Sequence, residues 1–252
     1  EVEKVLNLSK DIVPKVIVTN EKGIVFYRDK QKNIFMDIVK PTNQSVNRTI
    51  HASTLAFELS CKGEKIITNC GSMNRAIFND SDYLRYSAAH STIIVNNTNI
   101  SELNKNSYRR VPDNITFTKE DEENYILWTA SHNGYIKNYK KIITRKIKII
   151  KNKSEIFGED SIISTKTNNK KLVYHIRFHL MPQCNCIITN NKKNVIIRTN
   201  NQSWLFKSSS TISIEDSIFV NKNNLIQQTK QIVITGHIED RKKIEKWIFS
   251  KS

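Results

Sequence analysis

The sequence predicts an all-β protein built as a large antiparallel β-sandwich. Period-two alternation of apolar and polar residues recurs from end to end, and helical periodicity is almost absent. Short turn signals also return at even spacing, which is typical of two packed antiparallel sheets. No repeat of fixed period supports a propeller.

The expected strands are runs of alternating or continuously apolar residues bounded by turn residues. The first five are residues 15–19, 24–27, 34–39, 54–59 and 65–68, with turns at 20–23, 40–43 and 60–63. The next six are residues 92–96, 115–120, 125–132, 140–150, 156–163 and 171–179, with a hairpin turn expected at Asn133-Gly134. The last five are residues 186–189, 194–198, 204–207, 211–220 and 231–237, with turns at 166–170, 190–193 and 199–203.

We expect residues 1–252 to form a single β-sandwich domain with an irregular loop insertion around 72–113. This insertion is too long for a hairpin, and long loops in compact domains are usually functional, although a solvated connection with a short helix is the alternative. The chain starts at Glu1 without a visible signal peptide, so we expect it to be the C-terminal part of a longer protein.

Composition narrows the possible partners. A net charge of +16 suggests an anionic partner, either nucleic acid or an acidic polysaccharide. The basic residues are dispersed and mostly lysine, however, so an AT-rich coding sequence explains the charge equally well. No apolar run is long enough for a membrane span. The four cysteines lack zinc-finger or CxxC spacing and are expected to be free thiols.

Three strand-like blocks carry polar residues that a buried strand rarely contains, namely His51, Asn69 and His90. If these lie at matching ends of neighbouring strands, two imidazoles and one amide converge. Zinc accepts imidazole readily but normally completes its ligand set with a carboxylate or thiolate. The spacing has no local zinc signature, so core or hydrogen-bonding histidines are the alternative to a metal site.

The loop insertion supplies further candidates. Arg75, Arg85 and Arg109 present a guanidinium fork that suits carboxylate or sulfate, and Tyr86 offers a ring for sugar stacking. Solvated arginines and a partly buried tyrosine are the alternatives. His175 and His179 are four apart on an expected strand and so share a face, where packing is favoured over a metal pair.

The order of several motifs resembles the carboxy-terminal half of the heparinase II/III-like polysaccharide lyases, in particular their uncharacterised bacterial branch. The blocks that carry the resemblance are His51–Ser60, Asn69–Gly71, Ala88–Thr92, Ser101-Glu102, Ser131–Tyr135, Gly158–Asp160, Ile176–Leu180, Trp204 and Glu215–Ser217. Together they cover roughly residues 24–237, and several blocks in order are more specific than any one.

The resemblance implies an N-terminal (α/α) toroid followed by a C-terminal β-sandwich, with the active site in the cleft between them. It implies β-elimination on uronic-acid-containing acidic polysaccharide in the periplasm or cell envelope of a bacterium. In such lyases a tyrosine of the toroid serves as base or acid, and that tyrosine lies outside this chain. The chain alone is therefore not expected to be a complete enzyme.

Carried over by motif, His51, Asn69 and His90 occupy the metal-ligand positions, which implies a structural zinc ion that Asn69 weakens by removing a carboxylate. Thr49 replaces the substrate-facing histidine. Two alternatives to a lyase domain follow. One is a non-catalytic or degenerate carbohydrate-binding β-sandwich, which is favoured by Thr49 in place of the histidine and by Asn69 in place of the carboxylate. The other is a basic nucleic-acid-binding β domain, which the dispersed charges make the least favoured.

Overall fold

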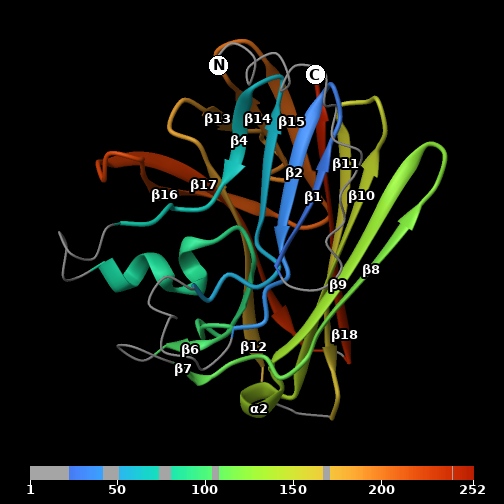
Figure 1. The fold of residues 1–252 in the computed structure, drawn as a ribbon, viewed down its shortest axis with the longest axis vertical. Helices are drawn as coiled ribbons and strands as arrows, with labels where there is room; N and C mark the ends of the chain where they lie inside the picture. Colours follow the sequence, from blue (N-terminus) through green and yellow to red (C-terminus); the bar gives the residue numbers. More distant parts are fainter. Residues whose placement is uncertain (1–22, 42–50, 74–80, 104–107, 167–170, 240) are drawn as a thin grey trace, which may run out of the picture.

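The computed structural model describes residues 23–41, 51–73, 81–103, 108–166, 171–239 and 241–252. Two antiparallel sheets of eight strands each face one another, and a two-stranded ribbon lies beside them (Figure 1). The expected antiparallel β-sandwich is therefore confirmed. The expected strand at 15–19 lies outside the described residues.

The first sheet has the strand order β1, β2, β3, β4, β12, β17, β16, and β5 pairs with β12 as well. Its strands are β1 (Ile24–Arg28), β2 (Lys32–Asp37), β3 (Phe57–Cys61), β4 (Glu64–Thr68), β5 (Ile93–Val95), β12 (Leu172–Leu180), β16 (Ile212–Val220) and β17 (Ile226–Ile238). Alternation decides the faces: Phe57 and Leu59 of β3 point into the core, whereas Glu58 lies on the outer face.

The second sheet has the strand order β13, β14, β15, β18, β11, β10, β9, β8. Its strands are β8 (Ile115–Asp121), β9 (Tyr125–Tyr135), β10 (Lys141–Ile150), β11 (Glu155–Ser164), β13 (Asn185–Ile188), β14 (Asn194–Arg198), β15 (Ser203–Ser208) and β18 (Lys242–Lys251). The ribbon is β6 (Glu102–Leu103) with β7 (Tyr108–Arg110).

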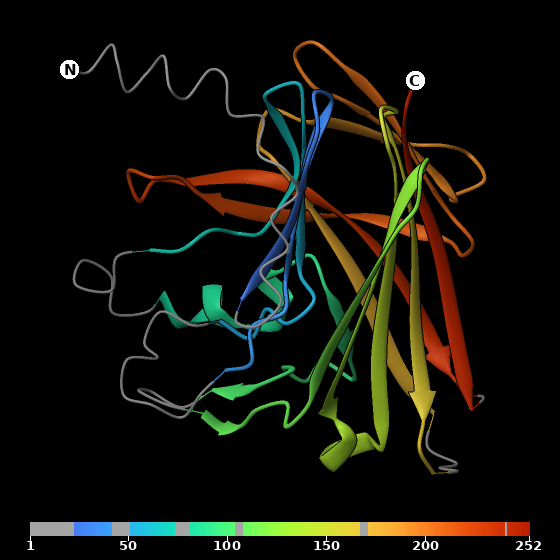
Figure 2. The same ribbon diagram turned by 45° about the vertical axis from the view of Figure 1, so that its right-hand side comes forward.

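Helical structure in the described residues is limited to short turns: η2 (Ser81–Arg85), η3 (Ser87–Ala89) and α2 (Ile136–Tyr139). None of these turns has the length and hydrophobicity that crossing a lipid bilayer would require. Figure 2 shows η2 and η3 on one side of the sandwich and β8 to β11 with β18 on the other.

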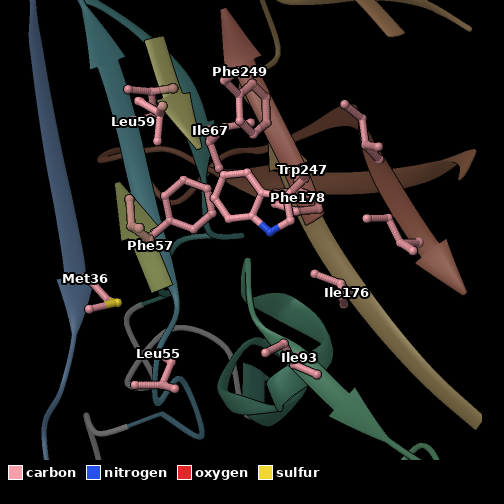
Figure 3. Packing of buried hydrophobic residues seen from close by; sticks show 14 of the residues in the cluster. Met36, Leu55, Phe57, Leu59, Ile67, Ile93, Ile176, Phe178, Trp247 and Phe249 are labelled. Carbon is pink, nitrogen blue, oxygen red and sulfur yellow. The ribbon is translucent and has the colours of Figure 1, made fainter. Parts of the chain in front are cut away.

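An aromatic cluster joins the two sheets at the centre of the core (Figure 3). The Trp247 indole stacks on Phe57 at 5.4 Å between ring centroids and meets Phe178 edge-on at 5.2 Å. Each such side chain contributes about 1.5–3 kcal/mol by leaving water. Gly158 of β11 makes room for this tryptophan, because a Cβ there would lie 2.0 Å from the indole.

A fully buried ion pair lies under the same cluster. Arg145 of β10 donates from Nε and Nη2 to both carboxylate oxygens of Asp160 on β11, at 2.7 and 2.9 Å. The Trp247 indole N–H donates to the same carboxylate at 2.9 Å. The guanidinium also lies 5.3 Å from the Phe57 ring centroid. Bidentate geometry and satisfied donors are what make a buried pair tolerable.

Two local expectations are wrong. Residues 242–251 were not expected to form a strand, yet they form β18 at the centre of the second sheet. Asn133-Gly134 is not a hairpin turn but lies within β9, and the chain reverses through α2 and Lys140 at φ +57°. Gly134 is needed for close approach, because a Cβ would lie 2.8 Å from the Ile100 carbonyl oxygen.

We predict that Arg145→Met lowers the free energy of unfolding by about 3–5 kcal/mol, because it leaves the Asp160 carboxylate buried without its cation. Chemical denaturation measures this loss. Lys146→Met, at the next and exposed position of β10, is the matched control and should change stability by less than about 0.5 kcal/mol. Equal losses in the two variants would contradict the role given to the pair.

Candidate functional site

The two histidines identified from the sequence lie side by side. The ring centroids of His51 and His90 are 5.2 Å apart with an interplanar angle of 56°. His90 follows the turn η3, and its backbone N–H donates to Ser87 O at 3.1 Å. The segment after His51 is fixed to η2, because the Ala52 N–H donates to Arg85 O at 2.8 Å.

Arg145 of the second sheet is hydrogen-bonded to the backbone of both histidine segments. Its Nη1 donates to Leu55 O at 2.9 Å and to Ser91 O at 2.7 Å. Leu55 adopts φ +62°, a left-handed conformation that costs a leucine about 1–2 kcal/mol and persists only where surrounding contacts enforce it. One buried side chain in the second sheet thus sets the position of two loops of the first.

His90 is buried, and within the described part of the chain neither of its ring nitrogens makes a hydrogen bond of normal geometry, although the Leu84 backbone lies near the ring. Burial, the neighbouring His51 and then His179 lower the pKa of His90 well below the usual histidine value, and the Leu84 backbone opposes this shift only weakly. The ring is therefore neutral at physiological pH. A neutral imidazole is the form that ligates a metal or accepts a proton.

Asn69 is joined to the histidine segments through Ser91, the residue after His90, and both ends of its amide are hydrogen-bonded. Its Nδ2 donates to Glu58 Oε1 at 3.1 Å, and its Oδ1 accepts the Ser91 N–H at 2.9 Å. Among the described residues, no three His, Cys, Asp or Glu side chains converge as a metal site. The imidazoles fit a metal, whereas the amide completes the donor set poorly. The metal assignment of His51, Asn69 and His90 stays a prediction.

Two hollows are lined by residues next to the histidine segments: Asn69, which accepts the Ser91 N–H, lines one, and Ala89, which precedes His90, lines the other. The Asn69 hollow, of about 380 Å³, lies on the outer face of β1 to β4 and is lined by Phe35, Asp37, Glu58 and Asn69 among others. Burial raises the pKa of Asp37. The second hollow, of about 560 Å³, is lined by Cys70, Tyr86, Ala88, His179, Ser217 and Gln231 among others, and we call it the His179 hollow.

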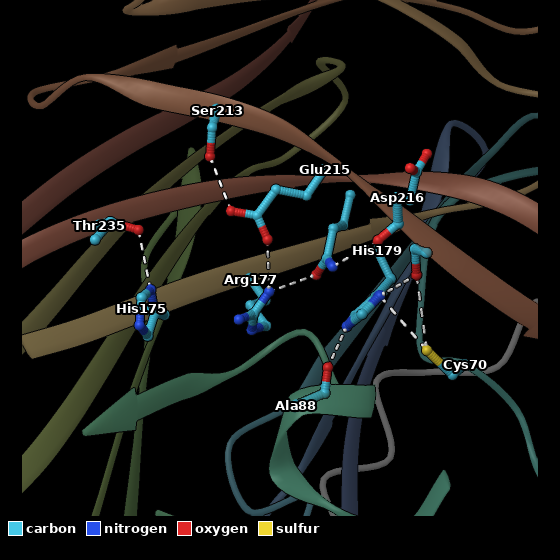
Figure 4. A network of polar contacts seen from close by, with 11 residues as sticks. Cys70, Ala88, His175, Arg177, His179, Ser213, Glu215, Asp216 and Thr235 are labelled. Atoms are coloured by element: carbon cyan, nitrogen blue, oxygen red, sulfur yellow. Dashed lines mark hydrogen bonds and ion pairs between the residues drawn. The ribbon is translucent and has the colours of Figure 1, made fainter. Parts of the chain in front are cut away.

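His179 is the centre of a polar network that the sequence did not reveal (Figure 4). Its Nε2 lies 3.0 Å from Ala88 O, which can only accept, so this nitrogen carries the proton. Its Nδ1 therefore accepts the Ser217 hydroxyl at 2.7 Å, with Cys70 Sγ at 3.5 Å. Burial and then Arg177 lower the pKa of His179 to about 4.

A second part of this network lies beside His179 on the same face of β12. Arg177 Nη1 donates to Glu215 Oε2 at 3.2 Å and to Gln231 Oε1 at 3.1 Å. Gln231 in turn donates to Asp216 O at 3.0 Å. His175 and His179 do share a face, as their spacing predicts. The only sequence signal was that spacing, because the partners come from β16 and β17.

The substrate-binding candidates have different environments. Tyr86 is 43% exposed and lines the His179 hollow. Arg109 is exposed on β7. Arg85 is buried at 2% exposure, on the turn that holds the His51 segment. Arg75 and Thr49 lie outside the described residues, so the structure says nothing of their positions.

Comparison with known proteins gives one family. The family described as Heparinase II/III-like, C-terminal, matches residues 14–248. The chain belongs to this family. No match was found among curated proteins.

Several solved structures of similar fold are those of heparinases and a heparan sulfate lyase. The heparan sulfate lyase HepC from Pedobacter heparinus has a TM-score of 0.73 at 16% identity, covering 92% of this chain and 35% of that one. A heparinase III structure has a TM-score of 0.73 at 13% identity, covering 94% and 37%. The heparinase III BT4657 gene product has a TM-score of 0.75 at 9% identity, covering 99% and 39%. At such low identities the structural likeness shows the fold alone, and this chain spans little more than a third of each of these proteins.

We predict that stability falls as the pH drops from about 6.5 towards 4. The pKa of His179 is about 4 and that of buried His132 about 3 in the folded protein, so the unfolded chain takes up these protons first. Each such histidine lowers the free energy of unfolding by about 1.4 kcal/mol for every pH unit below 6.5, until the pH reaches the pKa of that histidine in the folded protein.

Urea denaturation at a series of pH values measures this loss. His179→Gln and His132→Gln should each show a shallower pH dependence than the unmodified protein. Profiles of unchanged slope in both variants would contradict the assignment of neutral buried rings.

Proposed function

We propose that this chain is the β-sandwich domain of a lyase that cleaves uronic-acid-containing polysaccharide by β-elimination. In this proposal an N-terminal (α/α) toroid outside these residues supplies the tyrosine that acts as base or acid. The sandwich forms the opposite wall of the cleft. Family membership over residues 14–248 supports this function, since the family is that of heparinase C-terminal domains.

The structural observation that carries the proposal is the buried imidazole of His90 and the lack of normal hydrogen bonds to its ring nitrogens in the described part of the chain. Leaving a buried polar atom without a partner costs about 1–3 kcal/mol, and within the described ranges neither ring nitrogen of His90 makes a hydrogen bond of normal geometry. Its neighbour is a second imidazole at 5.2 Å between centroids, and both loops are fixed by Arg145. Protein stability alone does not favour this arrangement, whereas a bound ion or ligand would satisfy the ring.

The site must neutralise the carboxylate of the substrate and hold its sugar ring. β-Elimination needs neutralisation of the substrate carboxylate, which makes the adjacent C–H proton removable. Arg109, on the exposed ribbon, has the fork geometry to bind such an anion. Tyr86 presents an exposed ring over the His179 hollow, where a sugar can pack.

A zinc ion would be held by His51 and His90, with Asn69 as the weak third donor. When bound, zinc would supply positive charge and hold the two histidine loops together. Asn69 is neutral and its Oδ1 already accepts the Ser91 N–H, so we propose that this site binds zinc more weakly than one with a carboxylate at this position.

The second candidate function is a non-catalytic or degenerate carbohydrate-binding domain. Asn69 favours it directly, because its amide makes two hydrogen bonds that organise Glu58 and Ser91. Asn69 therefore has a structural role in the wall of the Asn69 hollow, and such a role is compatible with a domain that binds sugar without catalysing a reaction.

The longest native form of the protein, incubated with heparan sulfate, alginate and bacterial acidic exopolysaccharides, should produce the ultraviolet absorbance of unsaturated uronates. His90→Ala should lower kcat/KM by about tenfold or more, which corresponds to about 1.4 kcal/mol of lost transition-state stabilisation. His175→Ala, on the outer face of β12, is the control and should leave the rate unchanged. Absence of any absorbance change with binding intact would favour the degenerate binder.

Arg109→Gln should raise KM for uronate oligosaccharides several-fold, because a charge-assisted bond to the substrate anion is lost. Arg198→Gln removes the same charge from an exposed position of β14 and should leave KM unchanged. Initial rates over a range of substrate concentrations measure both constants. A KM shift of equal size in the two variants would show that only the overall charge matters.

A further inference from the structure

The outer face of the second sheet carries a group of lysines far from the histidine pair. Figures 1 and 2 both place β8 to β11 and β18 on the side opposite η2 and η3. The histidine pair belongs to the segments around η2 and η3. Any ligand bound on the outer face of the second sheet therefore occupies a separate site.

Strand register brings these lysines together around one aromatic ring. One cross-strand row reads Lys148 on β10, Phe157 on β11, Ile248 on β18 and Lys207 on β15. The next row on the same face reads Lys146, Glu159 and Lys246. Directly opposed residues have Cβ atoms about 5 Å apart and diagonal ones about 7–8 Å. Phe157 thus has Lys148 beside it and two further lysines at its diagonals. We call Lys146, Lys148, Lys207 and Lys246 with Phe157 the lysine face.

This surface is hollowed as well as charged. A depression of about 280 Å³ is lined by Lys146, Lys148, Lys246 and Phe157, with Glu159 as its acidic residue. Phe157 is 37% exposed, which is unusual for an aromatic residue in the middle of a sheet. Glu159 lies 3.8 Å from Lys146, a weak and solvent-exposed pair, and the depression keeps a net positive charge.

One of these lysines is also restrained by an aromatic ring. Lys148 Nζ lies 3.9 Å from the centroid of the Tyr125 ring, a cation–π contact that limits its freedom. The strands beneath are central in the sheet, so the register fixes the backbone positions from which the lysines extend. A restrained cation such as Lys148 loses less entropy when it binds an anion.

We propose that the lysine face binds a chain of anionic polysaccharide as an accessory site, separate from the histidine pair. The ammonium groups would bind the carboxylates or sulfates of successive sugars, and Phe157 would pack against the apolar C–H face of one sugar ring. The choice of this polymer rests on the proposed function. Single-stranded nucleic acid fits less well, because its binding uses several aromatic rings for successive bases and this face presents one.

Binding of the 252-residue chain to heparin, followed by calorimetry at several salt concentrations, tests the accessory site. The variant Lys146→Gln/Lys148→Gln/Lys246→Gln should bind about tenfold more weakly, with a shallower salt dependence. The control Lys62→Gln/Lys137→Gln/Lys171→Gln removes the same charge from exposed positions elsewhere and should bind within about twofold of the unmodified chain. Phe157→Leu should weaken binding without changing the salt dependence.

Three outcomes would overturn the proposal. Equal losses in the two triple variants would mean that heparin binds diffuse charge. Unchanged binding in the lysine-face variant would place the site elsewhere. A single-stranded DNA oligonucleotide that binds more tightly than heparin through the same lysines would assign the face to nucleic acid. Thermal unfolding of each variant verifies that it is folded.

This test is independent of cleavage. Binding to the lysine face is measured whether or not the protein is a lyase, so absence of β-elimination would not hide it. If the protein is a lyase, the lysine-face variant should show a raised KM for long polysaccharide and an unchanged KM for a tetrasaccharide. A raised KM on both substrates would place these lysines in the cleft and overturn the accessory role.

Discussion

The interaction on which the site depends is the buried guanidinium of Arg145. It neutralises Asp160 within the second sheet and donates across the core to Leu55 O and Ser91 O, the carbonyls that follow the two histidine positions. A buried ion pair is a poor source of net stability. An apolar pair could not replace it, because the guanidinium also donates hydrogen bonds that fix the positions of two irregular loops. Phe57 and Trp247 cover it on the core side.

The positions of His51, His90 and Asn69 all depend on Arg145. The Leu55 and Ser91 contacts fix the segments that carry His51 and His90. Asn69 receives the Ser91 N–H and so joins the same unit. Its chain neighbour Cys70 belongs to the His179 hollow instead. The histidine pair is therefore connected to both hollows through its neighbours: Asn69 of one hollow accepts the Ser91 N–H, and Ala89 of the other precedes His90.

The fold class could be predicted from sequence because alternation is a local property, and most strands appear where it is regular. β18 was missed because Glu245 breaks the pattern: it points inward and is stabilised by Ser209, Ser210 and Tyr174, which lie far along the chain. The motif order located His51 and His90, and the structure brings them together. His179 could not be recognised in advance, because its partners Cys70, Ala88 and Ser217 meet only in the folded sheet.

The most direct test of this account is ¹⁵N NMR of the histidine ring nitrogens as a uronate tetrasaccharide and zinc are added separately. Among the residues that the structure places, none forms a hydrogen bond of normal geometry with the two buried ring nitrogens of His90, so the account predicts that its resonances move with at least one ligand while those of His175 stay in place. Resonances of His90 that do not respond to either ligand, when the tetrasaccharide shifts other residues, would show that the histidine pair is not the functional centre.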